Sequence, residues 1–220
     1  MQKMKLIIVK NLLSLVVVVM VVAMSSMTVS CKAKGKSEGS SSDRYRVLVH
    51  KTLSDRALQY GASTRYMLLC DFSIPSNHDR FFVWDTEKDG IVYATWCAHG
   101  LGGNSTAEKP EFSNRVGSNC SSLGLYVVDR STGVSPRYGY TYHGLDGLDA
   151  TNSNARVRQV IIHYWSSVTN DWEAQISQPM RCDYRSAGCF TLPEPGFWKV
   201  DEYIKGENKR MLLLAIDGVE

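Results

Sequence analysis

The stretch Gln159-Val-Ile-Ile-His163-Tyr-Trp165 decides the fold, because it joins β-branched and aromatic residues into a run typical of a buried strand. Comparable runs recur along the chain, separated by Gly, Asn, Asp and Ser residues that favour turns. The segment Asp85–Gly90 has the composition of a hairpin turn. The strands predicted in this way cover residues 65–72, 80–85, 90–96, 123–128, 157–165 and 210–216.

Helix signals are fewer than strand signals. Ser54–Tyr60 stops at Gly61, and a run that begins at Pro195 stops at Gly206, where a glycine can terminate each helix. No internal repeat is visible in the sequence. We therefore expect a mainly antiparallel β domain with short helices at its periphery.

The N-terminus has the order of features found in an export signal. Three lysines precede an apolar run from Leu12 to Met24, and small or short residues then lead to Cys31. Val29-Ser30-Cys31 resembles the end of a bacterial lipoprotein signal, in which the cysteine receives lipid and becomes the first mature residue. Thr28 stands where such signals usually carry leucine. The alternative is an uncleaved anchor, because about 20 apolar residues can span a bilayer.

These features divide the chain into three parts. Residues 1–30 are predicted to be a lipoprotein signal peptide with lipidation at Cys31, and residues 31–43 offer almost nothing to bury and should form a flexible tether. Residues 44–220 are long enough for one domain with its own core. Both interpretations of the N-terminus tether this domain to a membrane in the cell envelope, facing the periplasm or the outer surface.

The charge balance argues against one class of partner. Of the 25 basic residues three lie within residues 1–30, so the mature chain carries 22 basic against 22 acidic residues. A neutral balance gives no electrostatic reason to expect nucleic acid as a partner.

The six cysteines stand at positions 31, 70, 97, 120, 182 and 189. If Cys31 carries lipid and Cys189 stays reduced, the other four allow three disulfide pairings, and the sequence does not choose among them. Cys97-Ala-His99 is the only close Cys/His cluster, and the chain has no CxxC or HExxH motif. We therefore expect neither a metal site nor a cofactor.

Cys189 follows the small residues Ser186-Ala187-Gly188 and lies downstream of the strand that carries His163. A thiol becomes a useful nucleophile when a base removes its proton, and a histidine on a neighbouring strand can do so. The small residues leave backbone N–H groups free to face an oxyanion. The pair predicts a thiol acyl-transfer enzyme. The alternatives are a buried structural cysteine and one half of a disulfide.

Three polar, glycine-rich segments lie between the predicted strands, at residues 98–104, 112–124 and 142–148. Glycine permits close backbone approach, and Ser and Asn can hydrogen-bond an extended peptide. Ordinary turn chemistry explains any one of these segments. Three of them beside a candidate nucleophile indicate a cleft.

With these residues in view, the chain resembles the YkuD-type L,D-transpeptidase catalytic domain, in the branch related to murein L,D-transpeptidases. The resemblance covers roughly residues 62–195 and implies a β-sandwich or barrel-like fold. Its motifs are Ala98-His99-Gly100, Phe112-Ser113-Asn114, Gly117-Ser118, Ser121-Ser122-Leu123-Gly124, Asn154-Ala155, Ile161-Ile162-His163 and Arg185-Ser186-Ala187-Gly188-Cys189.

The resemblance implies a membrane-tethered cysteine acyltransferase acting on peptidoglycan stem peptides. Cys189 would attack the carbonyl between an L-configured centre and a terminal D-residue, and His163 would act as base. The backbone N–H of Cys189 and the backbone around Gly188 would hold the oxyanion. An amine from a second stem would resolve the thioester into a cross-link. The residues implied in substrate binding are Arg185, Ser186, His99, Ser113, Asn114, Ser121 and Ser122.

The sequence departs from the commoner family pattern at two points. Ala187 replaces the histidine that usually precedes the Gly-Cys pair, and 25 residues lie between His163 and Cys189, more than usual. The additional residues are expected to form a lid or a longer wall over the site. Three other hypotheses stay open: an L,D-carboxypeptidase that trims stems, a non-catalytic peptidoglycan-binding lipoprotein, and a structural protein with a disulfide at Cys189.

Overall fold

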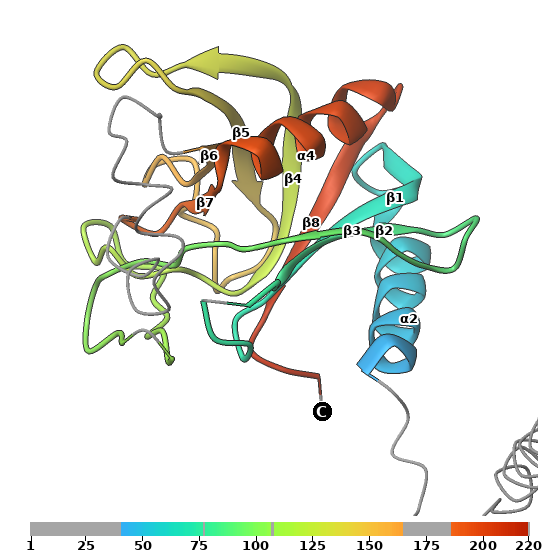
Figure 1. Ribbon diagram of the computed structural model, residues 1–220, viewed down its shortest axis with the longest axis horizontal. Coiled ribbons are helices and arrows are strands. Elements are labelled where there is room, and N and C mark those ends of the chain that lie inside the picture. The colour runs from blue at the N-terminus through green and yellow to red at the C-terminus, as the bar shows by residue number, and fades with distance from the viewer. Residues whose placement is uncertain (1–40, 77, 107, 165–185, 220) are drawn as a thin grey trace, which may run out of the picture. The chain divides into compact units, whose positions relative to one another are not determined.

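The computed structural model describes residues 41–219, apart from 77, 107 and 165–185. In this part of the chain eight strands form one sheet in the order β3-β2-β1-β8-β4-β5-β6-β7 (Figure 1). Five neighbouring pairs are antiparallel, whereas β1–β8 and β6–β7 are parallel. The strands are β1 (Ala62–Asp71), β2 (Phe81–Asp85), β3 (Gly90–Thr95), β4 (Gly124–Val134), β5 (Thr141–Gly147), β6 (Ile161–Tyr164), β7 (Phe190–Leu192) and β8 (Arg210–Ile216).

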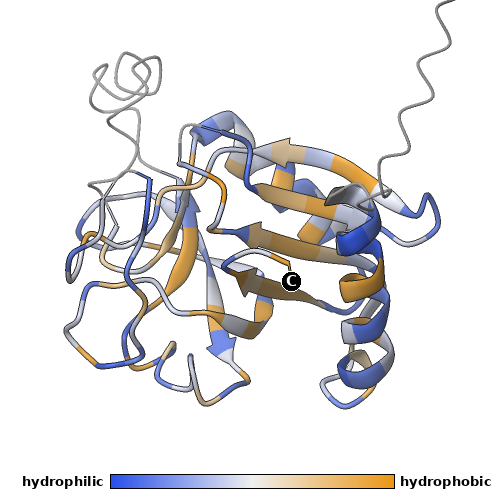
Figure 2. Ribbon diagram, turned by 90° about the horizontal axis from the view of Figure 1, so that it is seen from below, coloured by the Kyte–Doolittle hydropathy of each residue, from blue (hydrophilic) through white to orange (hydrophobic). Residues whose placement is uncertain are grey.

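Apolar clusters cover both faces of the central strands. Successive residues of β1 point to opposite faces, so Leu68 belongs to one buried cluster and its neighbour Leu69 to the other. Helix α4 (Glu194–Gly206) contributes to the first cluster and helix α2 (Ser41–Thr52) to the second. Strands buried on both faces consist of nearly continuous apolar residues. Figure 2 shows this hydrophobic colour along the strands.

The two helices each bury one face. Helix α2 continues into a π-helical turn, η1 (Leu53–Ala57), and their buried residues recur every four positions on one face: Tyr45, Val49, Leu53 and Ala57. Helix α4 carries Pro195 in its first turn, where the missing N–H removes no helical hydrogen bond. It extends to Gly206, where the sequence predicted its end.

The prediction of a mainly β, largely antiparallel domain with short helices is confirmed. All six predicted strands are present, although β4 continues six residues beyond its expected end at residue 128 and β6 begins four residues after its expected start. The sequence prediction missed β7, which has only three residues.

Two local predictions were wrong. Residues 142–148, expected to form a loop, belong mostly to β5. An added Cβ at Gly144 would meet the ends of the Arg156 and Asp129 side chains, so this glycine leaves room for their ion pair and does not mark a turn. The first helix starts at Ser41, inside the expected tether, rather than at Ser54.

Among the described residues, no helix is long and apolar enough to cross a membrane. The apolar run Leu12–Met24, the predicted lipidation residue Cys31 and the expected lid at 165–185 all lie outside the described residues.

Candidate active site

Cys189 lies where strands β6 and β7 begin. The two strands pair in parallel with His163 opposite Thr191, and Cys189 directly precedes β7. The Cys189 Sγ faces the carbonyl oxygen of Gln159 at 3.6 Å. Gln159 has a φ of 55°, a left-handed conformation that is costly for most non-glycine residues. The turn before β6 therefore holds a strained carbonyl group against the thiol.

The thiol opens onto a cavity of about 600 Å³. One wall is the tip of the β4–β5 hairpin, and the other is the turn that leads from Arg156 to Ile161. Among the described residues that line this cavity none is acidic, and three are arginines: Arg137, Arg156 and Arg158. The cavity therefore presents positive charge beside the thiol.

His163 lies on the neighbouring strand. Its Nδ1 hydrogen-bonds the carbonyl oxygen of Tyr164 at 2.9 Å, and its Nε2 lies 3.0 Å from Thr191 Oγ1. A carbonyl oxygen can only accept, so Nδ1 carries the hydrogen and Nε2 turns its lone pair to the Thr191 hydroxyl. Within the described part of the chain, no hydrogen bond joins His163 to Cys189. His163 lies on β6, and Cys189 lies just before the neighbouring strand β7.

Tyr140 covers the imidazole of His163. The two rings lie nearly parallel, with centroids 4.3 Å apart and 18° between their planes. Tyr138 in turn stacks on Tyr140 at 5.7 Å and 9°. Both tyrosines line the cavity, whereas His163 does not. The hairpin tip therefore shields the candidate base from the cavity.

The candidate nucleophile and base are both uncharged at neutral pH. Burial raises the pKa of the Cys189 thiol to about 11, against the opposing effects of the Ile161 N–H and the Arg158 charge. Burial also lowers the pKa of His163 to about 4. The arrangement at neutral pH is therefore a neutral thiol and a neutral imidazole, not a thiolate–imidazolium pair.

The backbone before Cys189 is held in place by Ser186. The Ser186 hydroxyl donates to the Cys189 carbonyl oxygen at 2.6 Å and accepts the N–H of Gly188 at 3.0 Å. Gly188 has a φ of 108°, which glycine adopts without strain. The sequence led us to expect that the backbone N–H of Cys189 and the backbone around Gly188 hold an oxyanion, and of these groups the Gly188 N–H is already engaged in this structure.

His99 is a buried group that braces a loop rather than a lining residue of the cavity. Arg80 donates to its Nδ1 at 2.8 Å, so Nε2 carries the hydrogen and donates to the Thr106 carbonyl oxygen at 2.9 Å. Burial, together with the charge of Arg80, lowers the pKa of His99 to about 4.

The other expected binding residues also form hydrogen bonds within the chain. Ser121 Oγ accepts the N–H of Gly100, and Ser113 N–H donates to the Ser121 carbonyl oxygen. The Asn114 amide braces residues 150–154. Ser122 Oγ contacts the Tyr126 hydroxyl. None of these side chains lines the Cys189 cavity, and Arg185 lies outside the described residues.

Sequence reasoning missed Arg158, which lines the cavity and donates hydrogen bonds to Ser113, Cys120 and Ser122. Nothing in the sequence marks it, because two of its three acceptors are backbone carbonyl groups.

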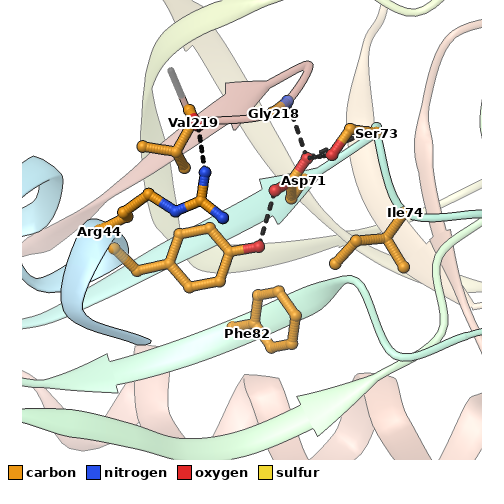
Figure 3. Close-up of a pocket in the computed structure, with 8 residues that line it drawn as sticks. Arg44, Asp71, Ser73, Ile74, Phe82, Gly218 and Val219 are labelled. Atoms are coloured by element: carbon orange, nitrogen blue, oxygen red, sulfur yellow. Dashed lines mark hydrogen bonds between the residues drawn. The ribbon is translucent and has the colours of Figure 1, made fainter. Parts of the chain in front are cut away.

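A second pocket, of about 350 Å³, lies under α2 (Figure 3). The buried Asp71 carboxylate at its base accepts hydrogen bonds from the Tyr45 hydroxyl, the Ser73 hydroxyl and N–H, and the Gly218 N–H. Arg44 donates to the Val219 carbonyl oxygen at 2.9 Å. These bonds tie α2 and the end of β1 to the C-terminal segment.

The described residues include no group of three His, Cys, Asp or Glu side chains placed to hold a metal ion. The four cysteines in this part of the chain carry free thiols: Cys70, Cys97, Cys120 and Cys189.

A family model described as the L,D-transpeptidase catalytic domain matches residues 36–213. No curated protein matches the chain. Two crystal structures of the helical cell shape determining protein Pgp2 from Campylobacter jejuni, one of them a point mutant, are similar at 12% identity, with TM-scores of 0.42 and 0.43. They cover 80% and 83% of this chain, which spans only 57% and 58% of theirs.

Proposed function

Because the chain belongs to the L,D-transpeptidase catalytic domain family, we propose that it is a cysteine acyltransferase acting on peptidoglycan stem peptides. The observation that carries this proposal is the position of Cys189, at a basic cavity and beside the strand that bears His163. Peptidoglycan stems carry carboxylates, and Arg137 and Arg158, which pair with no carboxylate among the described residues, offer them complementary charge.

In the proposed reaction the Cys189 sulfur attacks the carbonyl carbon between an L-configured centre and the terminal D-residue of a donor stem. His163 Nε2 accepts the thiol proton and returns it to the leaving amine. The C–N bond breaks, the D-residue departs, and a thioester remains on Cys189. An amine of a second stem then attacks the thioester carbonyl, frees the thiol and forms the cross-link.

One rearrangement has to precede this proton transfer. Nε2 of His163 faces the Thr191 hydroxyl, so one of these two side chains must rotate before Nε2 meets the Cys189 Sγ. Tyr140 stacks on the imidazole, and we propose that binding of a stem in the cavity displaces this ring.

The His163–Thr191 hydrogen bond favours a second candidate, a protein that binds peptidoglycan without turnover. In that case the cavity holds the stem while the base stays on Thr191. An L,D-carboxypeptidase would use the same thioester but resolve it with water, so its product is a trimmed stem.

Mass spectrometry of the full-length chain incubated with defined tetrapeptide muropeptides separates these candidates. We expect a protein adduct with the mass of the stem minus its terminal D-residue, and a cross-linked product when a second stem is present. Cys189→Ala should give neither, whereas Cys120→Ala, at a buried cysteine outside the cavity, should give both. Trimmed stems alone would indicate the carboxypeptidase, and bound but unchanged stems the non-catalytic protein.

We further propose that residues 1–30 are a lipoprotein signal peptide and that lipid on Cys31 tethers the catalytic domain, residues 44–220, to a membrane of the cell envelope. The support is Val29-Ser30-Cys31 after the apolar run. Labelling with a fatty acid analogue should mark the native chain and not Cys31→Ser. Persistent label in Cys31→Ser would exclude lipidation there.

A further inference from the structure

Arg158 connects the loop of residues 113–122 to the turn beside the thiol. Its Nη1 donates to the Ser113 carbonyl oxygen at 2.8 Å and to Ser122 Oγ at 3.2 Å, and its Nη2 donates to the Cys120 carbonyl oxygen. The next residue, Gln159, presents its own carbonyl group to the Cys189 Sγ. One guanidinium therefore fixes a distant loop to the turn that contacts the thiol.

The same guanidinium packs against the backbone that precedes the thiol. An added Cβ at Gly188 would lie 2.5 Å from the Cys120 carbonyl oxygen and 2.7 Å from Arg158 Nη2. Such contacts leave no free space between Gly188 and the pair formed by Arg158 and Cys120. The place of the guanidinium therefore limits where the backbone of Cys189 can lie.

Arg158 differs from its neighbour Arg156 in how its charge is used. Arg156 pairs with the carboxylates of Asp129 at 2.9 Å and Asp146 at 2.7 Å. Arg158 pairs with no carboxylate among the described residues, and its acceptors there are two carbonyl oxygens and a hydroxyl. Its positive charge therefore remains available to an anion in the cavity.

The other groups that act on the thiol are the Gln159 carbonyl oxygen, the Ile161 N–H, the Cys97 thiol and the Tyr140 phenol. Arg137 and Arg156 also line the cavity, and Arg156 is already paired with two carboxylates. Burial disfavours the thiolate, and a nearby cation is the group that most directly offsets this cost.

We propose that Arg158 is the positioning residue for Cys189, which it holds by fixing the 113–122 loop against Gly188, and that its charge stabilises the thiolate formed during the reaction. This inference rests on the proposed role of Cys189 as nucleophile. Arg158 acts through the thiol and its backbone, and no contact with substrate is required.

The test is the rate of Cys189 alkylation by iodoacetamide across neutral and alkaline pH, measured on the full-length chain by peptide mass spectrometry. Arg158→Gln removes the charge, so we expect alkylation near pH 8 to slow about tenfold, the effect of one pKa unit, with the profile displaced to higher pH. Arg158→Lys keeps the charge and should stay close to the native profile. Arg130→Gln, the matched control, removes the charge of an exposed arginine outside the cavity and should leave the profile in place.

An Arg158→Gln profile that coincides with the native one would overturn the proposal and leave Arg158 a purely structural clamp. If Arg158→Gln does not fold, Arg158→Lys decides the matter: a native profile supports the proposal, and a tenfold loss despite the retained charge overturns it. Iodoacetamide reports on the thiol alone, so the result is independent of whether the chain turns over peptidoglycan.

Discussion

The Asp71 pocket and the Cys189 cavity lie on the same sheet and use their polar groups in opposite ways. In the Asp71 pocket the carboxylate accepts four hydrogen bonds, and the donors come from α2, from the chain just after β1 and from the C-terminal segment (Figure 3). A buried carboxylate with this many donors stabilises the fold and has little capacity left for a ligand.

The Cys189 cavity is not saturated in this way. The thiol has one long contact, 3.6 Å to the Gln159 carbonyl oxygen, and Arg158 keeps a charge without a carboxylate partner among the described residues. A bound substrate can interact with the thiol and with the charge of Arg158. The comparison teaches that hydrogen-bond saturation, rather than the presence of a hollow, separates a structural pocket from a candidate site.

The largest expected effect belongs to the cavity. His163→Gln should slow formation of the Cys189 acyl-enzyme by about 10²–10⁴-fold, the usual contribution of a positioned acid–base group. Time-resolved mass spectrometry of the adduct measures it. Asp71→Ala, compared for its folded fraction at the same temperature, should retain the native rate. A native rate in His163→Gln would remove the assignment of the base.

Acid should weaken the fold through buried histidines. His99 and His163 have folded pKa values of about 4, below the 6.5 of an unfolded histidine, so the unfolded chain binds protons first as pH falls. Their stabilising effect is therefore complete above about pH 6.5 and is lost as pH falls toward 4, by up to about 3 kcal/mol for each histidine. Urea unfolding at several pH values measures the loss.

His99→Gln serves as the control for that measurement. The Gln amide can still accept from Arg80 and donate to Thr106, but it does not titrate. The loss of unfolding free energy as pH falls toward 4 should be smaller by the contribution of one histidine. An unchanged dependence would mean that His99 is not among the groups that drive it.

Asp71→Ala tests the saturated pocket. It leaves the Tyr45 hydroxyl and the Gly218 N–H without their acceptor, and we expect a loss of about 2 kcal/mol in the free energy of unfolding. Thermal or urea denaturation provides the value. A loss of acyl-enzyme chemistry in the folded Asp71→Ala protein would contradict the separation of the two pockets.

The smallest expected change in the free energy of unfolding comes from replacing one tyrosine by phenylalanine in each of the two pockets. Tyr45→Phe removes the hydroxyl that donates to Asp71 and should cost about 1 kcal/mol. Tyr138→Phe, at the exposed rim of the Cys189 cavity, should change the free energy of unfolding by less than about 0.5 kcal/mol. Equal losses of unfolding free energy at both positions would show that a tyrosine hydroxyl contributes as much to stability at the Cys189 cavity as at the Asp71 pocket.

The sequence predicts strands well where apolar residues are continuous, and less well where glycine is used for packing. All five residues of β2, Phe81–Asp85, are buried, as their apolar run indicates. Gly144 and Gly147 of β5 have the composition of a turn, but each makes room for a side chain or backbone from another segment. Helix α2 was missed because its surface is strongly polar, although its buried residues recur every four positions.

The candidate site was partly accessible from the sequence. The strand pattern around His163 is a local signal, and the strand that it predicts is present as β6, whereas β7, which follows Cys189, was missed. The contacts of Arg158 are not local, since its acceptors lie 36 to 45 positions away and two of them are backbone carbonyl groups. A single sequence carries no record of such partners.

Residues 164 and 186 are both fixed to neighbouring segments. Tyr164 pairs with Leu192, while Ser186 bridges Gly100 and donates to the Cys189 carbonyl oxygen. The spatial relation between His163 and Cys189 is therefore set by strand pairing and not by the number of residues between them. For protein engineering, these pairings are the contacts to preserve if the thiol is to keep its place relative to His163.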